Sequence, residues 1–278
     1  LGTVRSKEVE LLNITSLNIR ARTYKILPSS IRHLLVFIEL SFKMFMYAIR
    51  IKPYIVHCHD NTVLHIAMLI KMFTGAKIVY DAHELESDRN NLSKVAKKIT
   101  YYQEKLFWKY IDRLIVVSYS IKEWYNDNIG TKNTTVILNS PVFSKPTSKD
   151  KSEYLREKFS IPIESKIFLY VGMLRHGRGL DIITEIFKKN DIKSSLVFLG
   201  YCELVDELKK LESEYDNIFV HDAVPHEEVV SIAKSADIGL CLIQSVSLSD
   251  YYCLPNKLFE YFFAELPVLA SNFPYISL

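Results

Sequence analysis

Short apolar runs alternate with amphipathic helical patterns along most of this chain. Alternation of this kind predicts parallel sheets covered by helices on both faces. In the first half, the predicted strands lie near Val9–Ile14, Tyr54–His59, Lys77–His83, Arg113–Ser118 and Thr135–Asn139. In the second half, they lie near Ile167–Val171, Ser195–Leu199, Ile218–His221, Asp237–Ile243 and Val268–Ser271. We therefore predict an α/β protein with two doubly wound, Rossmann-like parallel-sheet domains that face each other across a cleft.

A polar segment between the two series has the composition of an interdomain linker. Residues Asn139–Asp150 contain two prolines, Pro141 and Pro146, and few apolar side chains. We place the domain boundary inside this segment. The prediction is an N-terminal, acceptor-side domain over 1–143 and a C-terminal, donor-binding domain over 144–278.

Composition favours a soluble enzyme. The chain has 278 residues, 49% of them hydrophobic, which suffices for two cores of ordinary domain size. A net charge of +3, with no basic run interleaved with aromatic residues, argues against a nucleic-acid partner. The four cysteines lie far apart, and no signal peptide pattern opens the chain, so we expect a reduced, cytoplasmic protein.

One long apolar helix pattern, Ile31–Ile51, has two interpretations. Glu39 and Lys43 interrupt it, so it is a poor membrane span. Packing against the core is the first interpretation. The second is peripheral contact with the inner membrane surface, with Arg32 and Arg50 flanking the apolar side chains.

Candidate chemistry begins with a glycine-rich turn. The predicted strand Ile167–Val171 leads into Gly172, Gly177 and Gly179, and a helical pattern follows. This arrangement brings backbone N–H groups close to a phosphate, and Arg178 could fork two oxygens of a diphosphate. The same glycines could also serve only to make a tight turn.

A second candidate is the predicted helix that starts near Pro255. Helix starts attract anions, and Lys257 adds positive charge in the first turn. Glu260, one turn further on, could accept hydrogen bonds from a ribose diol. Asn256 as a helix cap, Lys257 as a solvated charge and Glu260 as a helix former are the alternatives.

Several motifs in the chain resemble those of a known enzyme family. They are Tyr170–Leu174 with Gly177–Asp181, Ser235–Leu240, Leu254–Tyr261, Leu266–Ser271, and in the first half Tyr80–Glu84 and Val117–Ser120. In order and spacing they resemble the retaining GT-B glycosyltransferases called family 4 or group 1. The resemblance implies transfer of a sugar, with retention, from a UDP- or GDP-linked donor to a glycan or lipid-linked acceptor in surface polysaccharide or glycolipid synthesis. It also implies that the chain lacks an opening strand and terminal helices, and that no cofactor or metal is needed.

The resemblance assigns roles to individual residues. The implied catalytic residues are His83, Arg178 and Glu260. The implied donor-binding residues are Gly172, Gly177, Arg178, Tyr252, Asn256, Lys257, Leu258 and Glu260. His59 and Glu84 are implied on the acceptor side.

Two positions depart from the family pattern. Tyr252 stands where the family has the first of two glutamates, so Tyr252 or Asp250 must meet the donor sugar. Met173 stands where many relatives carry an arginine, which leaves phosphate binding to Arg178. A nucleotide-sugar epimerase and a catalytically silent nucleotide-binding module remain as alternatives.

His57 and His59 alternate to one face of a predicted strand, next to Asp60. We discount a metal there because third and fourth ligands do not follow at a recognisable spacing, and because the family that the chain resembles generally needs no metal for donor binding. Lining the cleft, or packing beneath it, is the interpretation we prefer.

Overall fold

A computed structural model describes residues 24–90, 92–141, 152–189 and 191–276. The predicted strand Val9–Ile14 and the predicted boundary at 143/144 lie outside these ranges and stay predictions. By internal contacts the chain divides into two compact units. The first comprises residues 1–82 and 102–114, and the second comprises 83–101 and 115–278.

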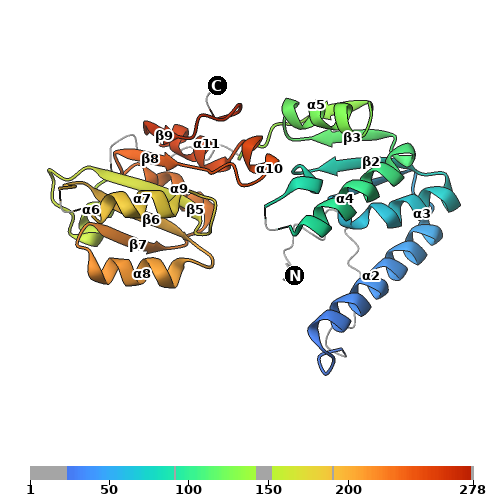
Figure 1. Cartoon of the computed structure of the whole chain (residues 1–278), viewed down its shortest axis with the longest axis horizontal. Helices are drawn as coiled ribbons and strands as arrows, with labels where there is room; N and C mark the ends of the chain where they lie inside the picture. The colour runs from blue at the N-terminus through green and yellow to red at the C-terminus, as the bar shows by residue number, and fades with distance from the viewer. Residues whose placement is uncertain (1–23, 91, 142–151, 190, 277–278) are drawn as a thin grey trace. The chain divides into compact units, whose positions relative to one another are not determined.

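The first sheet has four strands in the order β1-β2-β3-β4. They are β1 (Ile55–His59), β2 (Lys77–Ala82), β3 (Arg113–Val116) and β4 (Thr134–Val136). The α-helices that alternate with them are α2 (Ser29–Ile51), α3 (Leu64–Thr74), α4 (Lys94–Phe107) and α5 (Tyr119–Asn128), as Figure 1 shows. Short 3-10 turns are η1 (Asn61–Val63), η2 (Glu86–Asp88) and η3 (Trp108–Tyr110).

The second sheet has five parallel strands in the order β7-β6-β5-β8-β9. They are β5 (Ile167–Met173), β6 (Ser195–Tyr201), β7 (Ile218–Asp222), β8 (Ile238–Cys241) and β9 (Val268–Ala270). The helices are α6 (Tyr154–Phe159), α7 (Leu180–Phe187), α8 (Val205–Glu214), α9 (His226–Ala233), α10 (Leu248–Tyr251) and α11 (Asn256–Phe263). Each of the nine predicted strands that fall in the described ranges is present, so the α/β prediction is confirmed.

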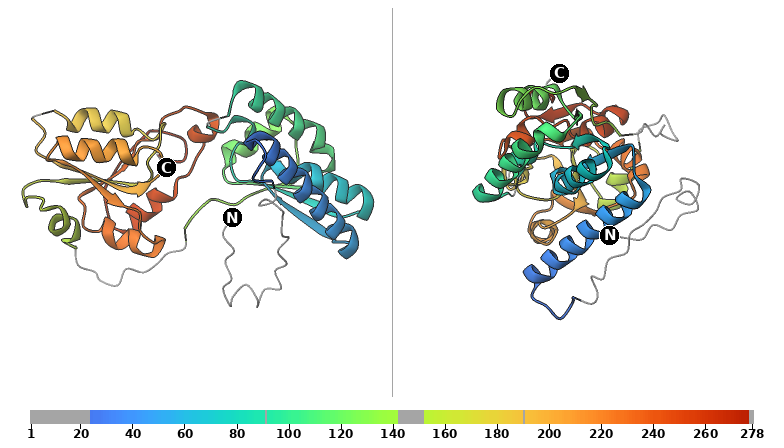
Figure 2. Two further views of the ribbon diagram at one scale, coloured as in Figure 1. Left: turned by 90° about the horizontal axis from the view of Figure 1, so that it is seen from below. Right: turned by 90° about the vertical axis from the view of Figure 1, so that its right-hand side faces the viewer.

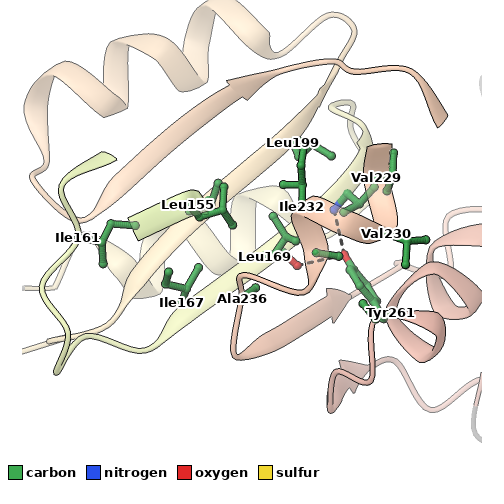
Figure 3. Packing of buried hydrophobic residues seen from close by; sticks show 14 residues of the cluster. Leu155, Ile161, Ile167, Leu169, Leu199, Val229, Val230, Ile232, Ala236 and Tyr261 are labelled. Carbon is green, nitrogen blue, oxygen red and sulfur yellow. Dashed lines mark hydrogen bonds between the residues drawn. The ribbon is translucent and has the colours of Figure 1, made fainter. Parts of the chain in front are cut away.

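Helices cover both faces of the second sheet (Figure 2). On one face, α7 and α8 pack against alternate strand residues such as Tyr170 and Phe198. On the other face, α6, α9 and α11 pack against Leu169 and Val171, the residues on either side of Tyr170 in β5 (Figure 3). Because successive strand residues point to opposite faces, burial on both faces makes β6 almost continuously apolar.

Among the described residues of the first unit, one side of α2 packs on α3. Met44, Phe45 and Ala48 join Ile66 and Ile70 in a small apolar cluster. The predicted core packing of this helix is therefore confirmed for that side. In the part of the chain that the structure describes, we find no helix with the length and apolar character needed to cross a membrane.

Candidate active site

The glycine-rich turn after β5 has the backbone that its sequence predicts. Gly172, Gly177 and Gly179 have φ values of 120°, 79° and 74°, which residues other than glycine rarely adopt. Gly179 caps the start of α7, where an added Cβ would lie 2.2 Å from the Leu242 carbonyl oxygen. The turn therefore needs glycine for its backbone conformation and also for space.

Helix α11 is fixed to the sheet by the residue that follows Glu260. The Tyr261 hydroxyl accepts a hydrogen bond from the Val171 N–H at 2.9 Å, and it lies 3.0 Å from the Leu169 carbonyl oxygen and 3.1 Å from that of Leu240. The ring is fully buried in the cluster drawn in Figure 3. These contacts place the first turn of α11 beside the carboxyl end of β5.

Lys257, in that first turn, is the most unusual cation of the site. Its Nζ lies 3.5 Å from the centre of the Tyr170 ring, and its Cε lies 3.6 Å from the position that a Cβ of Gly172 would occupy. The ammonium is buried and has no hydrogen-bond partner among the described residues. Burial lowers the pKa of Lys257 from 10.5 to about 7. A buried ammonium without an acceptor is poised to meet an incoming anion.

Glu260 lies one turn further along α11 and is also buried. Burial raises the pKa of its carboxyl above 4.5, while His226 and Lys257 act in the opposite direction. The His226 Nδ1 lies 3.3 Å from Glu260 Oε1. His226 begins α9, just beyond the end of β7, so two separate helix starts bring these side chains together.

Two arginines accompany Lys257. The Arg178 Nη1 lies 3.5 Å from the Asp250 carboxylate, which also accepts a 2.8 Å hydrogen bond from the Ser247 hydroxyl. Asp250 is buried, and Ser247 caps the short helix α10 that carries it. The Arg175 Nε is buried and, among the described residues, has no hydrogen-bond partner. Three cations therefore surround the carboxyl end of β5.

These side chains line a cavity of about 600 Å³ in the second unit. Its size is typical of small-molecule sites, and its position beyond the carboxyl ends of parallel strands is where open α/β sheets bind ligands. The predicted site residues on its wall are His83, Glu84, Gly172, Arg178, Asn256, Lys257 and Glu260.

Four other predicted residues lie elsewhere. Gly177, Tyr252 and Leu258 do not line the cavity, although Gly177 shapes the turn that carries Arg178. Tyr252 packs against Tyr251, and Asp250 lines the wall instead. His59 belongs to the first unit, where it lies beside His57 and Asp81.

Sequence reasoning did not find Arg175, His226 or Tyr170. His226 begins the helix after β7, so the rule that ligands gather at carboxyl strand ends could have found it. Arg175 stands in the glycine-rich turn beside the more obvious Arg178. Tyr170 belongs to one of the family motifs, but the motif alone gives it no role, because that role depends on the Lys257 side chain above its ring.

The two α/β sheets and the cation-rich cavity together define a protein of the GT-B glycosyltransferase class. The family model described as Glycosyltransferase Family 4 matches residues 6–140. The model described as Glycosyl transferases group 1 matches residues 151–277. The chain belongs to the family 4, or group 1, glycosyltransferases.

Solved structures support the same fold. Anabaena Alr3699/HepE in complex with UDP-glucose has a TM-score of 0.66 and 14% identity, over 86% of this chain and 65% of that chain. Sucrose-phosphate synthase from Thermosynechococcus elongatus has a TM-score of 0.68 and 14% identity, over 92% of this chain and 65% of the synthase chain. A glycosyltransferase from Rickettsia africae has a TM-score of 0.62 and 16% identity, over 96% of this chain and 68% of that chain.

The chain thus spans slightly less than two thirds of the length of HepE and of the synthase. At these identities the similarity establishes the fold. A comparison with curated proteins finds no match.

Proposed function

We propose that this protein is a glycosyltransferase that moves a sugar from a nucleoside-diphosphate sugar to a glycan or lipid-linked acceptor, with retention at the anomeric carbon. The observation that carries the proposal is the Lys257 ammonium. It is buried without an acceptor among the described residues, beside a helix start and two arginines, which is the environment a diphosphate requires.

In this proposal the cations act on the leaving group. As the bond from the anomeric carbon to the phosphate oxygen breaks, Lys257, Arg178 and the start of α11 stabilise the negative charge that develops on the diphosphate. The acceptor hydroxyl oxygen forms the new bond, and its proton passes to the departing phosphate oxygen. Glu260 holds the ribose diol, and His83 contacts the donor sugar.

The donor sugar needs a polar partner in place of the family's first glutamate. We assign that role to Asp250, because its buried carboxylate lines the cavity and Tyr252 does not. Arg178 and Ser247 hold the carboxylate in place. Asp250 would therefore link the sugar contact to the phosphate contact.

The neighbours favour uridine donors as the first to test. HepE was solved with UDP-glucose, with UDP, and with UDP and glucose, and a mutant of S. aureus TarM was solved with Fondaparinux, alpha-GlcNAc-glycerol and UDP. GDP-linked donors remain in the proposal, since no described residue is assigned to the base. A surface polysaccharide or glycolipid is the product class we propose.

We further propose that the enzyme acts at the cytoplasmic surface of a membrane through α2. Leu34, Ile38, Phe42 and Met46 recur every fourth residue and are between 49% and 64% exposed. They therefore form one stripe along the helix. Arg50 and Lys52, at the end of the helix, suit anionic lipid headgroups.

A product assay tests the proposed reaction. The protein is incubated with UDP- and GDP-sugars, with and without polyprenyl-linked or free oligosaccharide acceptors, and released nucleotide and product anomers are followed by NMR. We expect acceptor-dependent release of one nucleoside diphosphate, a retained anomer, and loss of turnover in Lys257→Met. Lys166→Met, at the amino end of β5, should behave like wild type because Lys166 is exposed.

Two outcomes would overturn the proposal. A changed sugar nucleotide formed without any acceptor would indicate an epimerase. Nucleotide binding with no product across the whole panel would indicate a silent binding module.

A further inference from the structure

A cluster of two histidines and a carboxylate lies in the first unit, and none of its three residues lines the cavity described above. His57 Nε2 lies 3.0 Å from Asp81 Oδ2, and His59 Nδ1 lies 3.6 Å from the same oxygen. One ligand atom from each residue lies within 4.8 Å of the other two. Among the residues that the structure describes, no other group of three or more His, Cys, Asp or Glu side chains comes this close together.

The register of two neighbouring strands produces this cluster. In the parallel pair of β1 and β2, His59 stands opposite Asp81, and His57 stands two residues earlier on the same strand. Side chains two apart on a strand share a face, and partners in register share it as well. Three potential ligands therefore project from one face at the carboxyl ends of both strands.

This arrangement supplies the third ligand that the sequence pattern lacked. Asp60, the neighbour in sequence, is not a member of the cluster, and Asp81 comes from the next strand along the chain. Only the strand register could have shown that. Asp81 is therefore the third ligand whose absence from the local sequence spacing spoke against a metal at His57 and His59.

The distances suit a transition-metal ion. With zinc–nitrogen and zinc–oxygen bonds near 2.0–2.2 Å and a tetrahedral angle, two ligand atoms lie about 3.4 Å apart. The two nitrogen–oxygen distances, 3.0 and 3.6 Å, bracket this value. The imidazole rings are stacked, with centroids 4.4 Å apart and an angle of 25° between planes, and His57 Nε2 is hydrogen-bonded to Asp81. Because each nitrogen lone pair lies in the plane of its ring, a shared ion requires at least one ring to turn about χ2.

The backbone next to the cluster is held in an unusual conformation. Asp60 has φ 63° and ψ 167°, a region that only glycine adopts easily. Its N–H donates a 3.1 Å hydrogen bond to the Asp81 carbonyl oxygen, which ties the ends of β1 and β2 together. The strain falls directly after His59, and strained residues concentrate at functional sites.

We propose that His57, His59 and Asp81 bind a divalent transition-metal ion of the zinc class. The donor set of two imidazoles and one carboxylate suits Zn²⁺ and Co²⁺ and is a poor match for Mg²⁺ or Ca²⁺, which prefer oxygen ligands. The side chains of His57 and His59 are 44% and 60% exposed, so water or a small oxygen ligand completes the coordination. None of the three ligands lines the cavity, so the proposal is independent of the donor chemistry, for which the family resemblance implies no metal.

The first test measures zinc binding to the EDTA-stripped full chain by calorimetry. We expect one site per chain in the wild-type protein and at least tenfold weaker binding in His57→Gln, His59→Gln and Asp81→Asn. His33→Gln should leave the affinity unchanged, because His33 is an exposed histidine outside the cluster. Circular dichroism confirms that each variant is folded.

A second test needs no variant. X-ray absorption of the zinc-loaded wild-type chain should show a nitrogen and oxygen shell with imidazole scattering and no sulfur, and Co²⁺ should give the visible absorption of a low-coordinate site. Sulfur ligation would place the ion at a cysteine such as the exposed Cys202 and would overturn the proposal. Absence of a single saturable site, or equal binding in His57→Gln and wild type, would also overturn it.

Discussion

At the scale of single residues, the buried ammonium of Lys257 carries the largest desolvation cost that we identify in the candidate active site. Its ammonium has lost water and has gained only the face of the Tyr170 ring in the described structure. A cation–π contact of this kind offsets part of the desolvation cost. The lowered pKa of Lys257 reflects the part of that cost that the contact does not offset. Lys257 is therefore expected to lower the folding stability of the unliganded protein and to stabilise the complex with a nucleoside diphosphate.

This expectation predicts a pH-dependent stability difference between wild type and Lys257→Met. Between a folded pKa of about 7 and an unfolded value of 10.5, the unfolded wild-type chain binds more protons than the folded one. The free energy of unfolding of wild type should therefore rise relative to the variant as pH increases through that window, and should change little below it. Urea unfolding of both proteins across this range measures the difference, and a constant difference would contradict the assigned burial.

Arg175 provides a second prediction at this scale. Its buried Nε has no partner among the described residues, and a charged hydrogen bond to phosphate contributes about 1.5–3 kcal/mol. Arg175→Gln should therefore weaken nucleoside-diphosphate binding about tenfold to a hundredfold, as measured by calorimetry. An unchanged affinity would mean that Arg178 and Lys257 suffice. The exposed Lys193→Gln, before β6, is the control.

At the scale of elements, the site depends on where α11 begins relative to β5. Tyr261 sets that position through its hydroxyl, and Gly239 on β8 leaves room for its ring, since an added Cβ would lie 2.6 Å from a ring carbon. Lys257 and Glu260 are carried on the same two turns. The buried packing of α11 therefore positions the polar residues that face the cavity.

Tyr261→Phe tests this dependence. The change keeps the ring and leaves the Val171 N–H without its hydroxyl partner, which should lower the free energy of unfolding by about 1–3 kcal/mol. Denaturant unfolding measures the loss, and Tyr119→Phe, which alters an exposed side chain, should cost far less. Equal stability of Tyr261→Phe and wild type would contradict the anchoring role.

The exposed stripe on α2 gives the other prediction at this scale. Ile38→Ser removes one apolar anchor and should weaken binding to phosphatidylserine vesicles about tenfold, because burial of such a side chain contributes about 1.5–3 kcal/mol. Vesicle co-sedimentation measures the effect. Ile163→Ser, an equally apolar and more exposed position, should leave it unchanged. If both variants bind like wild type, α2 is not the membrane contact.

At the scale of the whole molecule, the fold could be predicted where periodicity determines it. The sequence predicts a strand over Ile167–Val171 because a buried parallel strand is an uninterrupted apolar run, and β5 spans Ile167–Met173. The start of α11 was likewise visible in Pro255 and the residues after it. The glycine turn was visible because glycine alone tolerates its backbone angles.

The rest of the site depends on contacts between distant segments. Asp81 meets His57 and His59 through strand register, and His226 meets Glu260 across two helix starts. Asp250 lines the cavity and Tyr252 does not, because of the direction in which each side chain leaves the short helix α10. Local spacing can point to single residues such as His226 or Asp250, but it does not show which side chains these residues contact.

The most direct test of the central claim is calorimetric titration of UDP and GDP into wild type, Lys257→Met and Lys166→Met. A diphosphate site centred on Lys257 predicts saturable binding of one nucleotide by wild type and by Lys166→Met. It also predicts an affinity at least tenfold lower in Lys257→Met, without loss of folding. Equal binding by all three folded proteins, or no binding of either nucleotide by wild type, would contradict the account.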